Sequence, residues 1–158
     1  MLAVIQKVSS ASVEVESKIV GQISTGYCIL LGINKADTDK DIDYLVEKIS
    51  RIKLFENGDK RFKDNLITAG ASVLIVPQYT LYGNLKSKNS PSFTEAMAPD
   101  EANVLFDKFC TKMGEKGIHV EKGAFREFMK VNIVNEGPVT FILDSDHLKV
   151  NQKNDVQN

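Results

Sequence analysis

The first 33 residues alternate between short apolar runs and tight polar or glycine-containing breaks. The runs cover residues 2–8, 12–16, 19–24 and 27–33. Runs of this length are typical of β-strands, and breaks of two or three residues leave room only for tight turns. We therefore predict that the chain begins with four strands in an antiparallel meander.

The hydrophobic period changes after Asp37. Apolar residues then recur at steps of three and four, which predicts an amphipathic helix capped by Asp37 or Thr38. Its buried stripe consists of Ile42, Leu45, Val46, Ile49 and Ile52. Residues 56–60, Glu-Asn-Gly-Asp-Lys, then predict a turn.

A second helix is expected to begin at residues 98–101, Ala-Pro-Asp-Glu, because proline and acidic residues favour a first helical turn. Its stripe consists of Ala102, Leu105, Phe106, Phe109 and Met113, and Gly114 and Gly117 mark its end. Further strands are predicted at residues 72–76, 129–134 and 139–143. Many strands with two separate main helices indicate an α+β fold, with a mainly antiparallel, curled or barrel-like sheet and the helices outside it.

The length of 158 residues and the hydrophobic content of 42% fit one domain. We assign residues 1–148 to it and residues 149–158 to a polar tail with too little apolar content to stay ordered alone. With 20 basic and 21 acidic side chains, the net charge of −1 argues against binding long nucleic acid by bulk electrostatics, so DNA is not expected as a partner. A partner that presents only one RNA end remains compatible.

The two cysteines have no metal or redox spacing. Cys28 lies in an apolar run and Cys110 on a helix pattern, so both are expected to be core residues in a reducing compartment. Neither a signal peptide nor a run of eighteen apolar residues is present in the sequence. We therefore expect a cytoplasmic protein that does not bind membranes.

Two short segments carry most of the functional information. Residues 77–81, Pro-Gln-Tyr-Thr-Leu, follow the β-branched strand 72–76, and residues 135–140, Asn-Glu-Gly-Pro-Val-Thr, lie between two predicted strands. Taken singly, the first segment is compatible with an ordinary strand end and the second with a hairpin turn.

Together and in this order, the two segments resemble the two signature motifs of the D-aminoacyl-tRNA deacylases, formerly called D-tyrosyl-tRNA deacylases. The usual forms of those motifs are Ser-Gln-Phe-Thr and Asn-X-Gly-Pro-Val-Thr. The resemblance extends from residues 1–8 through Gly32 and residues 91–93 to residues 123–125 and Leu143, which is nearly the whole chain.

The resemblance implies a homodimeric esterase that acts on the acceptor end of aminoacyl-tRNA and releases free D-amino acid. In the family the pair at Gly137 and Pro138 is cis and is inserted from the other subunit, so that its carbonyl groups exclude an L side chain. Glycyl-tRNA, which has no side chain to exclude, is a further candidate substrate. The variable position at Glu136 suggests a turn role for that residue.

A side-chain catalytic set is missing from the sequence. Neither His119 nor His147 neighbours a plausible nucleophile, and no cluster of His, Cys and carboxylates has ligand spacing, so we expect no metal and no cofactor. We assign Gln78 and Thr80 to catalysis, with two roles open for Thr80: nucleophile, or oxyanion donor through its main-chain N–H. The second is favoured because no residue is evident to deprotonate Thr80.

Four residues are predicted to bind the substrate: Tyr79, Phe93, Phe125 and Met129. The last three match the family's pocket-lining segments, and an adenine ring needs such a surface to stack on. The alternative for Phe93 and Phe125 is an ordinary core position. Lys86 and Lys88 either touch acceptor-end phosphates or belong to a soluble loop.

Three positions depart from the family pattern. Pro77 replaces the usual Ser, Tyr79 replaces Phe, and Lys7 stands where Arg is usual and cannot reproduce its planar two-pronged contact. A related subfamily begins the first motif with Pro-Gln, holds Gly-Pro trans and has relaxed chirality. That subfamily usually has Phe where Val139 stands, so D-selectivity remains the first choice.

Two other functions compete with this one. A catalytically weak module of the same fold that binds nucleic acid or protein is compatible with Pro77 and Lys7, although Gln78, Thr80 and the Gly-Pro pair are intact. A hydrolase of small-molecule esters or amides would need a side-chain catalytic set, which the sequence does not offer.

Overall fold

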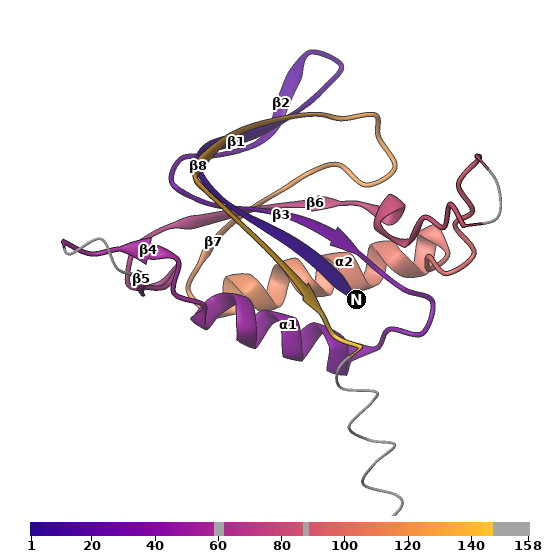
Figure 1. The fold of residues 1–158 in the computed structure, drawn as a ribbon. Helices are drawn as coiled ribbons and strands as arrows, with labels where there is room; N and C mark the ends of the chain where they lie inside the picture. Colours follow the sequence, from indigo (N-terminus) through magenta and orange to yellow (C-terminus); the bar gives the residue numbers. More distant parts are fainter. Residues whose placement is uncertain (59–61, 87–88, 147–158) are drawn as a thin grey trace, which may run out of the picture.

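The structure is a computed structural model that describes residues 1–58, 62–86 and 89–146. Within these residues a strongly curled sheet carries two α-helices on one face (Figure 1). The strand order is β2-β1-β3-β6-β7, and β8 pairs with β1. The predicted α+β class with a barrel-like sheet is confirmed. The predicted domain boundary at residue 148 and the tail 149–158 lie outside the described residues.

Strand β1 (Leu2–Val15) runs without interruption through residues 9–11, where we predicted a break. Its first half pairs with β3 (Gly26–Gly32) and its second half with β2 (Lys18–Ile23), both antiparallel, while β8 (Lys130–Asp144) pairs with both halves. The predicted meander of four strands is therefore wrong. One long strand pairs with both of the strands that follow it, so β3 lies beside β1 and not beside β2.

The other half of the sheet is parallel. Strand β6 (Ser72–Pro77) lies between β3 and β7 (His119–Lys122) and runs parallel to both. Parallel neighbours need long crossover connections, and here these contain α1 (Asp39–Arg51) and α2 (Pro99–Glu115) respectively. The main sheet is therefore mixed, and the expected antiparallel pairing holds there only for β1 and its neighbours. Strands β4 (Phe55–Glu56) and β5 (Phe62–Asp64) form a separate antiparallel pair.

Helix α1 (Asp39–Arg51) begins where the sequence predicted. Thr38 is its N-cap, and the Asp41 carboxylate accepts a hydrogen bond from the Thr38 N–H at 2.8 Å. Of the predicted stripe, Ile42, Leu45, Val46 and Ile49 are buried and Ile52 is partly buried. The predicted turn at residues 56–60 begins in β4 at Glu56, and residues 59 and 60 lie outside the described part.

Helix α2 (Pro99–Glu115) has proline in its first turn, also as predicted. Of the two glycines predicted to mark its end, Gly114 still lies inside the helix, and Gly117 follows the end with φ of 81°. Three ion pairs join the helices at steps of four residues: Asp39–Lys108 at 3.1 Å, Asp43–Lys112, and Glu47–Lys116 at 2.7 Å. The two helices therefore lie side by side and run in the same direction (Figure 1). Neither of these described helices has the length and apolar character needed to cross a membrane.

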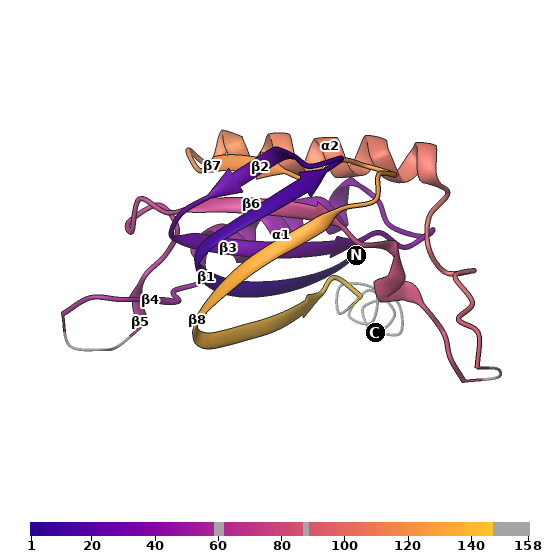
Figure 2. The same cartoon turned by 90° about the horizontal axis from the view of Figure 1, so that it is seen from above.

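The ends of the curled sheet approach each other at Gly21. A Cβ atom at this position would lie 2.7 Å from the carbonyl oxygen of Lys122, so only glycine allows β2 to pass so close to β7. The sheet is thereby nearly closed (Figure 2). The side chains buried together inside the curl are Val8, Ala11, Val13, Ile23, Cys28, Leu74 and Val76.

A larger core fills the space between the sheet and the helices, with Tyr27, Phe106 and Phe109 among its largest members. Cys110 belongs to this core and Cys28 to the smaller one, as predicted. Burial raises the pKa of the Cys28 thiol to about 11 and that of Cys110 to about 12, so both remain protonated at neutral pH.

A buried polar cluster joins the beginning of β1 to α1 and to the end of β8. The amino group of Met1 donates to Asp37 Oδ1 at 2.6 Å and to Ser145 Oγ at 2.7 Å. Ser145 Oγ in turn donates to Asp41 Oδ1 at 2.6 Å. A buried charge is tolerated only when it is paired in this way, so the cluster fixes how the three segments meet.

Candidate active site

The first motif begins where β6 ends. The Gln78 N–H donates to the Leu31 carbonyl at 2.8 Å, which extends the β3–β6 pairing by one residue. A single 3-10 turn, η1 (Tyr79–Tyr82), follows directly. The backbone of the motif is therefore held by the buried core of the sheet, although Tyr79 and Thr80 themselves are exposed.

Gln78 and Thr80, the two residues predicted to be catalytic, are in direct contact. Gln78 Nε2 donates a hydrogen bond to Thr80 Oγ1. The amide N–H groups of Tyr79 and Thr80 are the first two of the 3-10 turn and so have no acceptor within it. Two main-chain donors thus lie beside this side-chain pair, an arrangement suited to a developing negative charge on oxygen.

A cavity of about 790 Å³ opens beside the motif. Its lining includes five of the predicted site residues, namely Gln78, Tyr79, Phe93, Phe125 and Met129. Thr80 is not part of the lining, and its hydroxyl contacts the lining residue Gln78. The departure Pro77 also lines the cavity, together with apolar residues from β3, from the segment before α2 and from the first turn of that helix. A hollow of this size and apolar character can receive an aminoacyl nucleoside.

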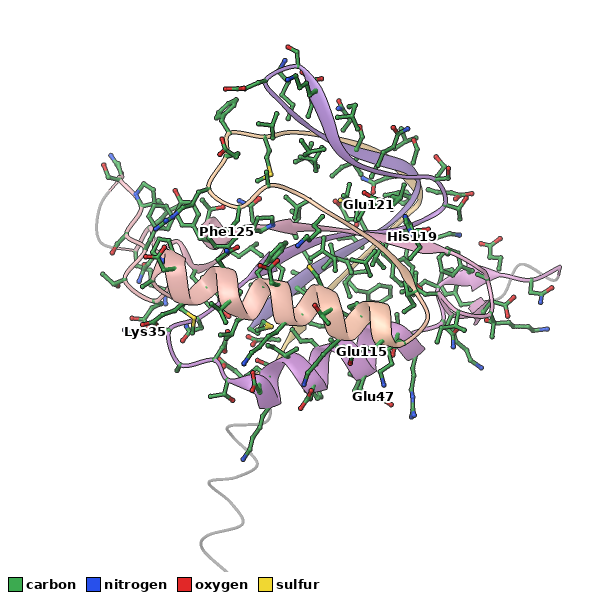
Figure 3. All side chains as sticks on the ribbon, turned by 180° about the vertical axis from the view of Figure 1, so that it is seen from behind. Lys35, Glu47, Glu115, His119, Glu121 and Phe125 are labelled. Atoms are coloured by element: carbon green, nitrogen blue, oxygen red, sulfur yellow. The ribbon has the colours of Figure 1, made fainter. Side chains whose placement is uncertain are left out.

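The aromatic residues of the lining differ in how far they are exposed or packed against the core. The Tyr79 and Phe93 rings meet edge to face with centroids 5.0 Å apart, and Tyr79 is 60% exposed, so its extra hydroxyl is not buried. The Phe125 ring lies 5.9 Å from that of Phe106, a residue of the main core. Phe125 near the N-terminal half of α2 (Figure 3) is therefore both a lining residue and a core contact.

The segment between β7 and β8 forms the opposite wall. Gly123 is buried, and a Cβ atom there would lie 2.9 Å from Met129 Sδ and 3.3 Å from Pro77 Cδ, so glycine lets Met129 pack over the end of β6. Three further lining residues of this segment were not predicted, namely Arg126, Glu127 and Phe128. Arg126 has φ of 65° and pairs with Asp100 at 2.9 Å, which ties the segment to the start of α2.

The second motif lies inside β8 and does not form a hairpin. Pairing with β1 passes from Gln6–Thr140 directly to Val8–Asn135, so residues 136–139 have no partner on β1. We call these four residues the β8 bulge. It contains Gly137, with φ of 126°, and the Gly137–Pro138 peptide bond is cis. The strand continues on both sides of the bulge because β1 is long enough to pair with both.

The two motifs do not meet within one chain. Neither Gly137 nor Pro138 belongs to the lining of the cavity. Figures 1 and 2 both show the bend of β8 at the end of the molecule opposite η1. The sequence could not indicate this separation, because it depends on how the sheet curls.

Lys7 stands opposite the β8 bulge, between Gln6 and Val8. Its side chain is buried, and its ammonium group lies 5.7 Å from the centre of the Phe55 ring. Lys86 is exposed, in keeping with a solvated loop as well as with a phosphate contact, and Lys88 lies outside the described residues.

The remaining titratable groups form no second catalytic set in the described part of the chain. His119 pairs with Glu121 at 3.0 Å on the exposed side of β7, away from Phe125 in Figure 3, and His147 is not described. Glu136 is exposed in the bulge. The described residues contain no group of three His, Cys, Asp or Glu side chains placed to hold a metal ion.

Comparison with known proteins gives one consistent family. The profile of the family described as D-Tyr-tRNA(Tyr) deacylase matches residues 4–144. A protein of Kosmotoga olearia named D-aminoacyl-tRNA deacylase is 46% identical over 145 residues, which is 92% of this chain and 97% of that protein. A protein of Thermotoga petrophila with the same name is 43% identical over 148 residues, covering 94% and 99%.

Two solved structures share the fold. One, titled c-Myc DNA Unwinding Element Binding Protein, has a TM-score of 0.84 and 32% identity and covers 91% of this chain and 98% of its own. The other, titled as a structural analysis of a probable eukaryotic D-amino acid tRNA deacylase, has a TM-score of 0.76 over 90% of this chain and 98% of its own. At 20% identity, this second likeness concerns the fold alone.

Proposed function

Because the chain belongs to the D-Tyr-tRNA(Tyr) deacylase family, we propose that it hydrolyses the ester bond between a D-amino acid and the 3′-terminal adenosine of tRNA. The products are free D-amino acid and tRNA, so the reaction removes D-amino acids before translation uses them. The observation that carries the proposal is the single cavity that Gln78, Tyr79, Phe93, Phe125 and Met129 line together. A protein with this activity is expected in the cytoplasm, where tRNA is charged.

The proposed chemistry needs little from side chains. The ester is an activated acyl group, and water attacks its carbonyl carbon to form a tetrahedral oxyanion. The N–H groups of Tyr79 and Thr80 stabilise that charge. Collapse of the intermediate breaks the bond to the ribose oxygen, which takes up the proton that water lost, with the neighbouring ribose hydroxyl assisting the transfer.

Thr80 acts in this proposal as a donor and positioning group and not as the nucleophile. Its hydroxyl oxygen accepts a hydrogen bond from Gln78 Nε2. A carboxamide cannot take up a proton at neutral pH, so this contact does not activate the hydroxyl. The contact supports a role for Gln78 in holding η1 in the orientation that presents its two N–H groups.

Selection against L-amino acids is assigned to Gly137 and Pro138 of a second copy of the chain. Residues 136–138 of the β8 bulge are exposed and lie away from the cavity of their own chain, so they are free to enter the cavity of a partner. Its carbonyl groups would then occupy the space that an L side chain needs. A glycyl ester has no side chain to exclude, so the same arrangement admits glycyl-tRNA.

The surface of β8 supports a homodimer. This strand is paired only with β1 in the described residues, and Val134, Phe141 and Ile142 on it are 55%, 42% and 67% exposed. Exposed apolar side chains along an unpaired strand edge favour association with another chain. A second copy related by twofold symmetry covers both edges at once.

A nucleic-acid-binding module without turnover is the second candidate. The observation in its favour is the name of the 32% identical solved structure, which describes a protein that binds a DNA element. The hypothesis of a small-molecule hydrolase receives no such support. It would require turnover of simple D-amino-acid esters that carry no RNA.

The experiment is release of amino acid from matched D- and L-tyrosyl-tRNA by the purified protein, in the presence of a chelator. Rapid release from the D form alone is the expected result. Failure to release amino acid from either form, with tRNA or DNA still bound, would move the assignment to the binding module. Equal turnover of D-tyrosine methyl ester would instead favour the small-molecule hydrolase.

A further inference from the structure

Phe128 is the most exposed large apolar side chain in the described part of the chain, at 89%. A phenylalanine in water forgoes most of the stabilisation that its burial would provide. Its neighbours behave differently, since Phe125 packs against Phe106 and Met129 packs over Gly123. The segment is thus fixed on both sides of a ring that itself projects into solvent.

The backbone that presents this ring is anchored. The Gly123 N–H donates to the Ile75 carbonyl at 2.8 Å, and Arg126 pairs with Asp100. In both Figures 1 and 2 the connection between β7 and β8 lies at the same end of the molecule as η1. Phe128 is therefore held at the cavity and does not swing on a long loop.

Phe128 borders two hollows. It lines the large cavity beside η1, and it also lines a smaller hollow of about 260 Å³. The other residues of the smaller hollow are Glu14, Glu16, Ser17 and Lys130. A ligand that leaves the large cavity toward the turn between β1 and β2 therefore passes over this ring.

The charges of the smaller hollow suit a base better than a phosphate. It contains two carboxylates and one ammonium group, and Lys130 is already paired with Glu14 at 3.2 Å. Carboxylates repel phosphate groups but accept hydrogen bonds from the exocyclic amino group of cytosine. Aromatic side chains at such positions stack on unpaired bases of single-stranded RNA.

We propose that Phe128 stacks on the base of the penultimate nucleotide of tRNA, a cytosine in the CCA end, and that the hollow beyond Phe128 receives this base. The inference rests on the proposed function, in which the terminal aminoacyl adenosine occupies the large cavity. Phe128 is then a substrate-binding residue that distinguishes tRNA from a charged nucleoside.

The test compares D-tyrosyl-tRNA with D-tyrosyl adenosine, which lacks the penultimate nucleotide. Phe128→Ala is expected to lower kcat/KM on the tRNA by about tenfold, mainly through KM, because loss of one stacked base has effects of this order. On the adenosine ester the variant should equal the unaltered protein. Phe128→Tyr should retain activity on both substrates.

A tRNA without a base at the penultimate position completes the cycle. The unaltered protein should lose about the same factor on this tRNA, and Phe128→Ala should lose nothing more, since the two changes remove one interaction. Phe62→Ala is the matched control. Phe62 is a phenylalanine 47% exposed on β5, at the end of the molecule away from η1, and its replacement should leave all rates unchanged.

Three results would overturn the proposal: equal loss on both substrates, no loss on the tRNA, or a weaker dimer in sedimentation for Phe128→Ala. If D-tyrosyl-tRNA is not hydrolysed at all, the proposed function fails separately. Binding of the trinucleotide CCA and of adenosine then decides the role of Phe128. Tighter binding of CCA that Phe128→Ala abolishes supports the proposal, and equal binding of the two probes contradicts it.

Discussion

The η1 segment and the β8 bulge are both short irregular stretches fixed by strands, yet they differ in what lies beside them. The η1 segment follows β6 directly and borders the cavity of its own chain. The bulge is paired to β1 on both sides and projects at the other end of the molecule. One chain therefore holds the groups suited to the chemistry at its cavity, and the groups suited to selection elsewhere.

This difference separates what a single chain can do from what an assembly must supply. Gln78 and Thr80 touch within the chain, so their geometry does not depend on a partner. Gly137 and Pro138 line no part of their own cavity. If both motifs serve one reaction, rate and chirality are controlled by different subunits.

The largest expected effect comes from removing a main-chain donor of η1. Tyr79→Pro deletes the Tyr79 N–H, and Gln78, with φ of −141° and ψ of 76°, is not helical, so proline can follow it. We expect kcat on D-tyrosyl-tRNA to fall about 100- to 1,000-fold, the usual loss for one oxyanion donor.

Tyr79→Ala is the control for that measurement, because it removes the ring contact with Phe93 and keeps the N–H. Its kcat should stay far closer to that of the unaltered protein. Equal losses in the two variants would show that the Tyr79 ring matters and that its N–H does not.

The next effect concerns chirality and tests whether the bulge acts on the partner. At Gly137, φ of 126° disfavours any other residue, and a Cβ atom would lie 2.7 Å from Val139 Cγ2, so Gly137→Ala displaces the carbonyl groups. If the displaced carbonyl groups lose about 1–3 kcal/mol of discrimination against an L side chain, the ratio of D to L hydrolysis should fall about fivefold to 150-fold.

Mixing subunits sharpens this result. In a dimer of Gly137→Ala with Gln78→Ala, the cavity with an intact Gln78 faces an intact bulge from the other chain. An excess of the Gln78→Ala chain should therefore raise the ratio of D to L hydrolysis from the low value of the Gly137→Ala protein to that of the unaltered protein. An unchanged ratio would mean that the bulge acts within its own chain, or not at all.

A smaller effect is expected for Thr80→Ala. Loss of the contact with Gln78 removes one hydrogen bond, while the Thr80 N–H remains, so the rate should fall only about threefold to tenfold. Single-turnover rates on D-tyrosyl-tRNA measure this. Complete loss, together with an acylated Thr80 trapped by rapid quenching, would instead identify the hydroxyl as the nucleophile.

The smallest effect is expected at the ion pairs between α1 and α2, which belong neither to η1 nor to the β8 bulge. Lys116→Ala breaks the ion pair with Glu47 and should lower the melting temperature slightly at pH 7 without changing kcat. The hydrogen bond from Lys116 lowers the pKa of Glu47 from 4.5. The stabilisation is therefore complete above pH 4.5 and disappears as the pH falls through the lowered pKa, where variant and unaltered protein should melt together.

How far the sequence predicted the structure depends on the range of the interactions involved. Both helices and the N-cap of α1 follow from local patterns, and five of the lining residues follow from the resemblance to the family. The continuity of β1 through Ser9 and Ser10 does not, because two serines look like a turn until a strand such as β8 pairs with one of them, here Ser10 with Val134. The sequence indicated Phe128 only weakly, since it is an apolar residue between Glu127 and Met129 that belongs to no periodic stripe.

The β8 bulge limits which sequence changes this chain can accept during evolution. Between two fixed pairings, four residues of β8 face the single residue Lys7 of β1. A change of length there that shifted the later pairing by one residue would turn every later side chain of the strand to the opposite face. Ile142, now 67% exposed, would exchange places with Leu143, which packs against the main core. New side chains are therefore tolerated at the exposed Glu136, whereas Gly137 must remain glycine and the pairing on both sides must keep its register.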